Sequence, residues 1–114
     1  ILLDINDFKQ VNDRHGHSAG DSVLTELANR LKTTVRESDF AGRLGGDEFI
    51  ILARQIDTEA LLAQMLERMR QQLDGTMTLS GNDIDIRISM GAAVFPSDGD
   101  TLDTLLGVWP RNIL

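Results

Sequence analysis

The sequence contains no cysteine, so neither a disulfide framework nor a thiolate metal site can form. It also lacks an apolar run near the roughly 20 residues that span a bilayer, and its first residues lack the basic region and cleavage site of a secretory peptide. Basic residues are in the minority, with 11 Lys and Arg against 18 Asp and Glu, for a net charge of -7. Because the chain lacks such an apolar run, we expect no direct insertion into a membrane, and because its charge repels a phosphate backbone, we expect no DNA or RNA partner.

What the sequence does contain is typical of a soluble globular domain. Hydrophobic residues make up 41% of the chain and charged residues 25%, close to average values. A chain of 114 residues can bury one core but not two. We therefore predict a single domain over residues 1–114, and we expect further sequence upstream because the chain begins inside an apolar, strand-like segment.

The spacing of apolar residues predicts two long helices and several strands. Val23, Leu24, Leu27 and Leu31 recur at helical spacing, and residues 84–90 alternate between apolar and polar. The predicted helices cover 18–36 and about 62–73; the predicted strands cover 1–5, 39–44, 48–53, 76–79 and 84–90; and residues 6–17 are predicted to be a loop. The order strand, helix, strand, strand, helix, strand predicts an α+β, ferredoxin-like antiparallel sheet with helices on one face.

Two acidic clusters lie at the ends of predicted strands. Asp4 closes the first strand, and Asp47 and Glu48 follow the Gly45-Gly46 pair at a predicted hairpin turn. If these two strands lie side by side, the carboxylates converge, and they repel each other unless a hard cation such as Mg²⁺ or Mn²⁺ lies between them. The alternative is that these are ordinary solvated turn residues.

Several short motifs occur together in one order along the chain. They are DINDFK at 4–9, ND at 12–13, GH at 16–17, GD at 20–21, RLGGDEF at 43–49 and SMGAA at 89–93. In this order they resemble the GGDEF domain of bacterial diguanylate cyclases over residues 1 to about 106. The resemblance implies a polymerase-palm-like fold related to nucleotidyl cyclases. It also implies a homodimer whose two domains each bind one GTP and together form cyclic di-GMP and pyrophosphate.

The same resemblance implies a metal and catalytic site. Asp4, Asp47 and the carbonyl of Ile5 correspond to the metal ligands, and Glu48 corresponds to a residue that assists the metal or helps to deprotonate the attacking hydroxyl. Asp47 and Glu48 are therefore the expected catalytic pair, with Mg²⁺ or Mn²⁺ as cofactor. Asn6 stands where many family members have a second Asp, which removes one negative charge but keeps an oxygen acceptor.

Four residues are implied to bind the substrate. Asn12 and Asp21 correspond to the residues that read guanine, while Phe8 and Lys9 belong to the segment that holds the β- and γ-phosphates. Ser18-x-x-Asp21 is also a capping-box pattern, so helix capping is the alternative role for Asp21. For Phe8 alone, core packing is the more common role.

Three further features have both a functional and a structural interpretation. Arg36 and Asp39 correspond to the family's inhibitory product site, and the alternative is a local ion pair at a helix end. Arg43 is expected to order the acidic turn by charge pairing. His15 and His17 lack a third nitrogen or sulfur ligand, which argues against a metal site there.

The chain departs from the family pattern at residues 107–114. The family's helix containing tyrosine, alanine and lysine is absent, and only Arg111-Asn112 echoes its final glycine-arginine-asparagine turn. Because that segment helps to hold the triphosphate, the alternative function is a degenerate domain that senses GTP or cyclic di-GMP. In either case the resemblance implies a cytoplasmic domain, whose parent protein can be anchored to a membrane.

Overall fold

The computed structural model describes residues 1–79, 81–99 and 101–106. Its elements in chain order are β1 (Leu2–Ile5), α1 (Phe8–His15), α2 (His17–Thr34), β2 (Phe40–Gly45), β3 (Glu48–Leu52), α3 (Glu59–Leu73), β4 (Gly75–Leu79), β5 (Asn82–Ile86), β6 (Ile88–Gly91) and α4 (Leu102–Leu106). None of the helices in these ranges is long and apolar enough to cross a membrane.

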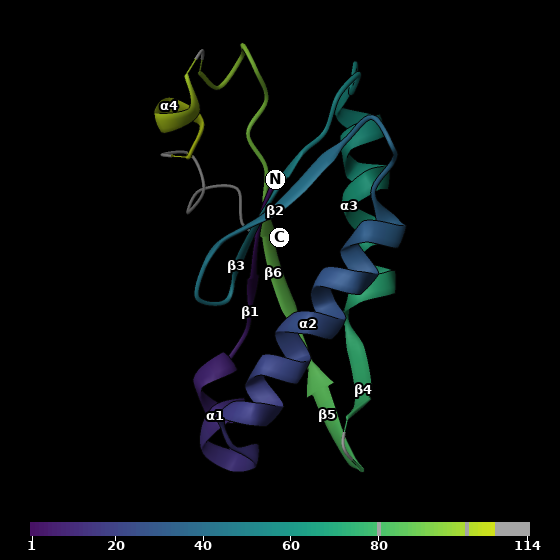
Figure 1. Cartoon of the computed structure of the whole chain (residues 1–114). Coiled ribbons are helices and arrows are strands. Elements are labelled where there is room, and N and C mark those ends of the chain that lie inside the picture. Colours follow the sequence, from purple (N-terminus) through teal and green to yellow (C-terminus); the bar gives the residue numbers. More distant parts are fainter. Residues whose placement is uncertain (80, 100, 107–114) are drawn as a thin grey trace.

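The main sheet has four antiparallel strands in the order β2-β3-β1-β6, and β4 and β5 form a separate hairpin. Helices α2 and α3 pack against each other, and α1 lies where the chain leaves β1 (Figure 1). The predicted α+β fold with an antiparallel sheet is confirmed. The predicted strand over residues 76–79 is confirmed as β4, which pairs with β5.

The core lies between the sheet and the two long helices. Side chains alternate along a strand, so β1 directs Leu3 and Ile5 into the core while Asp4 faces the other way. Each fully buried Leu or Ile contributes about 1.5–3 kcal/mol by leaving water. The helices supply the opposite wall of this core from one apolar stripe each: Val23, Leu24, Leu27 and Leu31 from α2, and Met65, Leu66, Met69 and Leu73 from α3.

The prediction of a loop over residues 6–17 is wrong, because α1 occupies most of it. Its eight residues are mostly polar, and only Val11 is buried. The helix is stabilised by packing on α2 rather than by an apolar stripe of its own, so the sequence pattern does not reveal it. The second helix begins at His17 and ends at Thr34, since Val35 takes an extended backbone with φ -79° and ψ 154°.

The predicted strand over residues 84–90 is two strands in different sheets. β5 pairs with β4, whereas β6 pairs with β1, and the break falls at Arg87. The Arg87 carbonyl accepts a hydrogen bond from the Asn6 amide at 2.8 Å, so it pairs with the chain after β1. Ile84, Ile86, Ile88 and Met90 are all buried, and the alternation therefore continues across the break without marking it.

Candidate active site

The pairing of β1 with β3 brings the acidic residues together. In the antiparallel register Asp4 lies opposite Glu48, the first residue of β3, and Asp47 precedes it in the turn from β2. The two strands therefore do lie side by side, which is the condition under which these carboxylates were expected to converge. On the other side of β1, Asp4 pairs with Ser89 of β6. Asp4 therefore lies on a central strand, with β3 on one side and β6 on the other.

The surroundings of Asp4 disfavour its charged form. Burial, a hydrogen bond with Asp47 and the negative charges of Asp47 and Glu48 raise the pKa of Asp4 from 3.8 to about 6. Its Oδ1 atom is buried and has no hydrogen-bond partner among the described residues. A buried oxygen without a partner beside two more carboxylates is a donor set suited to a hard cation.

The side chains alone do not enclose such a cation. Within residues 1–79, 81–99 and 101–106, no three His, Cys, Asp or Glu side chains are grouped closely enough to hold a metal ion. A cation at this edge of the sheet would need further oxygens from a backbone carbonyl, water or a bound phosphate.

The turn that carries Asp47 is built from two glycines and one arginine. Gly45 has a φ of 151° and Gly46 a φ of 52°, values that favour glycine. Arg43 Nε donates a hydrogen bond to the Gly46 carbonyl at 2.8 Å. Arg43 therefore contacts this turn as expected, but the expected charge pairing is wrong, because the acceptor is a neutral carbonyl.

Asn6 is held on the β6 side of the site. The Ser89 hydroxyl donates to Asn6 Oδ1 at 2.5 Å, across 83 residues of sequence. The family-like motif at 89–93 drew attention to Ser89 but assigned it no role, and no local signal links the two residues. Ser89 thus fixes the orientation of the Asn6 side chain.

Helices α1 and α2 approach closely at Gly20. A Cβ atom built on Gly20 would lie 1.9 Å from Asn12 Oδ1 and 3.2 Å from Phe8 Cζ. Gly20 therefore leaves the space in which Asn12 and Phe8 lie, a requirement that local sequence patterns do not reveal. Phe8 is partly buried against the core, and Lys9 is exposed beside it. Both belong to the first turn of α1 rather than to the predicted loop.

Asp21 lies one turn into α2, on the wall of a cavity. The capping alternative for Asp21 is wrong, since α2 begins at His17 and Gly16 occupies its N-cap position. Asp21 is exposed and lines a cavity of about 530 Å³ between α2 and β2, a size typical of small-molecule sites. Leu24, Gly42 and Arg43 line the same cavity.

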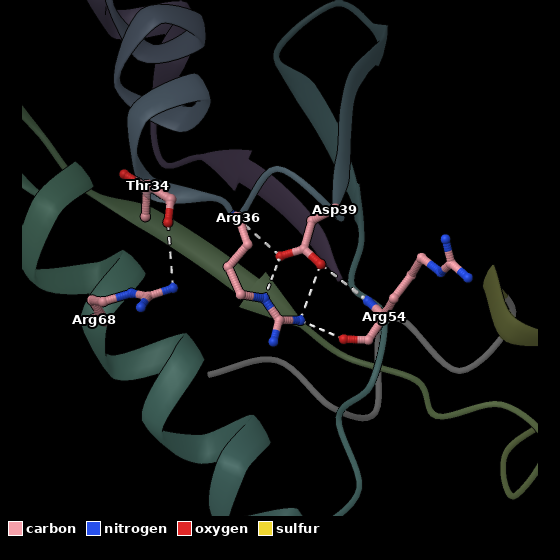
Figure 2. Close-up of polar contacts among 5 residues, drawn as sticks. All are labelled: Thr34, Arg36, Asp39, Arg54 and Arg68. Atoms are coloured by element: carbon pink, nitrogen blue, oxygen red, sulfur yellow. Dashed lines mark hydrogen bonds and ion pairs between the residues drawn. The ribbon is translucent and has the colours of Figure 1, made fainter.

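Arg36 and Asp39 form a closed cluster at the far end of the β2–β3 hairpin (Figure 2). Arg36 Nε and Nη2 each donate to the Asp39 carboxylate at 3.0 Å. That carboxylate also accepts the Arg36 and Arg54 amides at 3.2 and 3.1 Å, and Arg36 Nη2 donates to the Arg54 carbonyl. The ion pair of the alternative interpretation is therefore present, and it joins the start of β2 to the chain after β3.

The Asp39 side chain has no exposed surface, whereas the Arg36 side chain is 40% exposed. Burial raises the pKa of Asp39, but the hydrogen bonds from Arg36 and from the Arg54 and Arg36 amides outweigh it and hold the pKa below 3.8. The Arg36 guanidinium thus faces solvent while its Asp39 partner is enclosed. The Arg111-Asn112 pair noted in the sequence lies outside the described residues.

Residues 1–108 match the family model described as "Diguanylate cyclase, GGDEF domain". The chain belongs to the GGDEF domain family. Diguanylate cyclase TpbB of Pseudomonas aeruginosa is 36% identical over 107 residues, which are 93% of this chain and 25% of TpbB. The crystal structure of the TpbB GGDEF domain superposes with a TM-score of 0.90 at 34% identity, covering 96% of this chain and 69% of that one.

A second solved relative is the GGDEF domain of DgcB from Caulobacter crescentus, determined in complex with cyclic di-GMP. It has a TM-score of 0.63 and 28% identity, covering 76% of this chain and 53% of that one. This chain spans between 13% and 29% of the length of eight curated relatives. The similarity thus assigns the family of this domain, and the activity of the whole protein is a separate question.

Proposed function

We propose that this GGDEF domain is the catalytic module of a diguanylate cyclase, which converts two GTP into one cyclic di-GMP and two pyrophosphates. The observation that carries the proposal is the placement of Asp4 opposite Glu48 with Asp47 at the adjacent turn. A chain that consumes GTP works where GTP is available, so we assign it to the cytoplasm.

The proposed metal site uses Asp4, Asp47, the carbonyl of Ile5 and assistance from Glu48. The Asp4 Oδ1 atom supports this assignment, because a cation would satisfy a buried side-chain oxygen that has no hydrogen-bond partner among the described residues. A bound Mg²⁺ or Mn²⁺ would polarise a phosphoryl oxygen and neutralise charge as it develops. The chain's own contribution is to fix the carboxylates on two paired strands and on the turn that precedes β3, so that they need not reorganise during the reaction.

The proposed nucleotide site lies at the junction of α1, α2 and β2. Asp21 accepts hydrogen bonds from the ring N–H and amino group of guanine, and Asn12 contributes a further polar contact to the base. Lys9 attracts the β- and γ-phosphates, and Phe8 shapes the segment whose backbone amides hold them. The cavity between α2 and β2 supports the placement of Asp21 by its size, and Arg43 and Phe49, which flank the acidic turn in sequence, line it as well.

The reaction requires two such domains facing each other in a homodimer. The 3′-hydroxyl of one GTP attacks the α-phosphorus of the other, a P–O bond forms, and pyrophosphate leaves with the electrons of the broken bond. Glu48 helps to remove the proton of the attacking hydroxyl. The same step, taken once in each direction, closes the ring. Because the chemistry depends on how the two nucleotides are aligned, their alignment supplies much of the rate enhancement.

We further propose that Arg36 and Asp39 mediate inhibition by the product. The half-exposed guanidinium of Arg36 supports contact with a phosphate or guanine edge. Both oxygens of Asp39 are occupied by Arg36 and the Arg54 amide, so a ligand meets Arg36 first. A direct contact between Asp39 and guanine would require the cluster to open.

The test is conversion of GTP to cyclic di-GMP with Mg²⁺, followed by chromatography, in this chain and in a version extended by family-like flanking segments. Asp47→Asn should abolish turnover, and the exposed Glu37→Gln is the matched control that should retain it. Binding of guanine nucleotide without turnover in both forms would instead establish the sensor function.

A further inference from the structure

We propose that Arg43 is a positioning residue, which sets the orientation of Asp47 by holding the carbonyl of Gly46. This inference rests on the proposed function for its consequence in catalysis. Its structural part, the restraint on the turn, stands independently of that function.

The turn needs an external restraint because its backbone is permissive. Gly45 and Gly46 are adjacent, and both have positive φ angles, so many other conformations of this segment are open to the chain. The strand register also shifts here: Arg43 lies opposite Phe49, but Gly45 lies opposite Glu48, so Leu44 is an extra residue in β2. A bulge of this kind interrupts the regular hydrogen-bond ladder next to the turn.

Arg43 provides that restraint from a fixed base. Its strand partner Phe49 is 3% exposed and belongs to the core, which anchors the Arg43 backbone. From there Nε–H reaches the Gly46 carbonyl at 2.8 Å. The Gly46 carbonyl and the Asp47 amide belong to one planar peptide unit, so fixing the carbonyl fixes the plane from which the Asp47 side chain departs.

The geometry of the contact favours arginine over lysine. The Nε–H of a guanidinium is held in plane near the end of the side chain, whereas an ammonium is a rotating point donor. Within the part of the chain that the structure describes, Arg43 takes part in none of the ion pairs. The Arg43 guanidinium therefore bonds the turn rather than a carboxylate. Arg43 also lines the same cavity as Asp21.

The test compares Arg43→Ala and Arg43→Lys with the wild-type chain, and Arg87→Ala is the control because Arg87 forms an exposed ion pair with Asp85. Hydrogen exchange is measured in the metal-free protein. We expect the Asp47 amide to exchange about tenfold faster in both Arg43 variants and unchanged in the control. Unchanged exchange in both variants would overturn the proposal, whatever happens to activity.

Kinetics of the GTP reaction supply the second measurement. We expect kcat to fall about 10- to 100-fold in Arg43→Ala, with KM for GTP within about twofold, because the misplaced group acts in the transition state. Added guanidinium should partly restore Arg43→Ala. A rise in KM at constant kcat would overturn the positioning role in favour of direct nucleotide binding. If the wild type itself makes no product, the proposed function fails, while the exchange rates still decide the restraint.

Discussion

Asp4 lies on a central strand with two further carboxylates beside it, and its buried Oδ1 has no hydrogen-bond partner within the described part of the chain. Its folded-state pKa of about 6 lies above the usual 3.8, so the folded protein binds this proton more tightly than the unfolded chain does. The corresponding stability is fully present below pH 3.8 and is lost as the pH rises through 6. In the absence of metal, Asp4 therefore opposes folding at neutral pH.

Replacing Asp4 by Asn should stabilise the metal-free protein at pH 7 by about 1 kcal/mol, because the carboxyl is partly exposed and solvent screens part of the effect of its raised pKa. The advantage should shrink between pH 6 and pH 3.8 as the wild-type carboxyl becomes protonated. Urea unfolding in the presence of a chelator measures this difference, with Glu37→Gln as an exposed control. A stability difference between the two proteins that stays constant from pH 4 to pH 7 would show that folding does not raise the pKa of Asp4.

Replacing Gly20 by Ala is expected to destabilise the protein, in contrast to the replacement of Asp4. In an exposed helix interior, replacing Gly by Ala stabilises by up to about 1 kcal/mol. Here the new Cβ would lie 1.9 Å from Asn12 Oδ1, so we expect Gly20→Ala to destabilise by about 1–3 kcal/mol through overpacking. Binding of GTP should weaken as Asn12 is displaced. Thermal unfolding and calorimetric titration measure both effects, and Ser18→Ala on the same helix should change neither.

At this scale, sequence reasoning succeeded where a motif is local. Asp47 and Glu48 follow a glycine pair, and the strands that carry Asp4 and Glu48 do pair, as the expected convergence of the carboxylates required. The roles of Gly20, Ser89 and the Arg43–Gly46 contact were missed. Each depends on an approach between atoms, such as the 2.5 Å contact of Ser89 with Asn6, that no spacing in the sequence specifies.

At the scale of elements, Asp74 connects the end of α3 to the start of β6. Its Oδ1 accepts the Ile88 amide at 2.8 Å, and its Oδ2 accepts Arg70 Nη1 at 3.2 Å. Arg70 Nη1 also donates to the Ile88 carbonyl at 3.2 Å. One carboxylate and one guanidinium thus fix the point at which the chain leaves the β4–β5 hairpin for the main sheet.

Asp74→Ala should cost about 1–3 kcal/mol, because it leaves the amide of the buried Ile88 without its acceptor. Asp74→Asn keeps one oxygen acceptor and should cost less. Urea unfolding of the two variants distinguishes the lost hydrogen bond from a general effect of charge. Equal losses in both would mean that the ion pair with Arg70, rather than the amide contact, stabilises this junction.

The elements also show where periodicity stops being informative. The predicted bounds of α2 and α3 lie within a few residues of the observed ones, because each helix carries a full apolar stripe. Helix α1 was missed because its stability comes from contact with α2. The division between β5 and β6 was missed because both strands face one core and keep the same alternation.

At the scale of the whole molecule, the β2–β3 hairpin joins two distant sites. Its closed end carries Asp47 and Glu48, and its open end is tied by Arg36, Asp39 and the Arg54 backbone. Figure 2 shows the Arg54 side chain directed away from this cluster, so only its backbone takes part. A ligand that draws Arg36 outward would therefore loosen the hairpin at the end opposite the acidic turn.

If Arg36 reads the product, Arg36→Ala should weaken binding of cyclic di-GMP at least about tenfold, since charge-assisted pairs to a phosphate are lost. Initial rates at low product concentration should stay within about twofold of the wild type. Calorimetric titration and progress curves measure these quantities, with Arg30→Ala as a control that removes only a surface ion pair. Unchanged product affinity in Arg36→Ala would leave the cluster with a purely structural role.

The pleat of β1 ties accurate folding to chemistry. Leu3 and Ile5 fill the core while Asp4 faces away. A shift of the β1 register by one residue would therefore bury the Asp4 carboxyl in the core, which is strongly unfavourable. A slip of two residues would preserve the packing pattern yet set Leu2 or Asn6 opposite Glu48. Such a chain would stay compact but lose the acidic site assigned to it. Under the proposed function, GTP turnover is therefore a stricter test than thermal stability of whether β1 has its native register with β3.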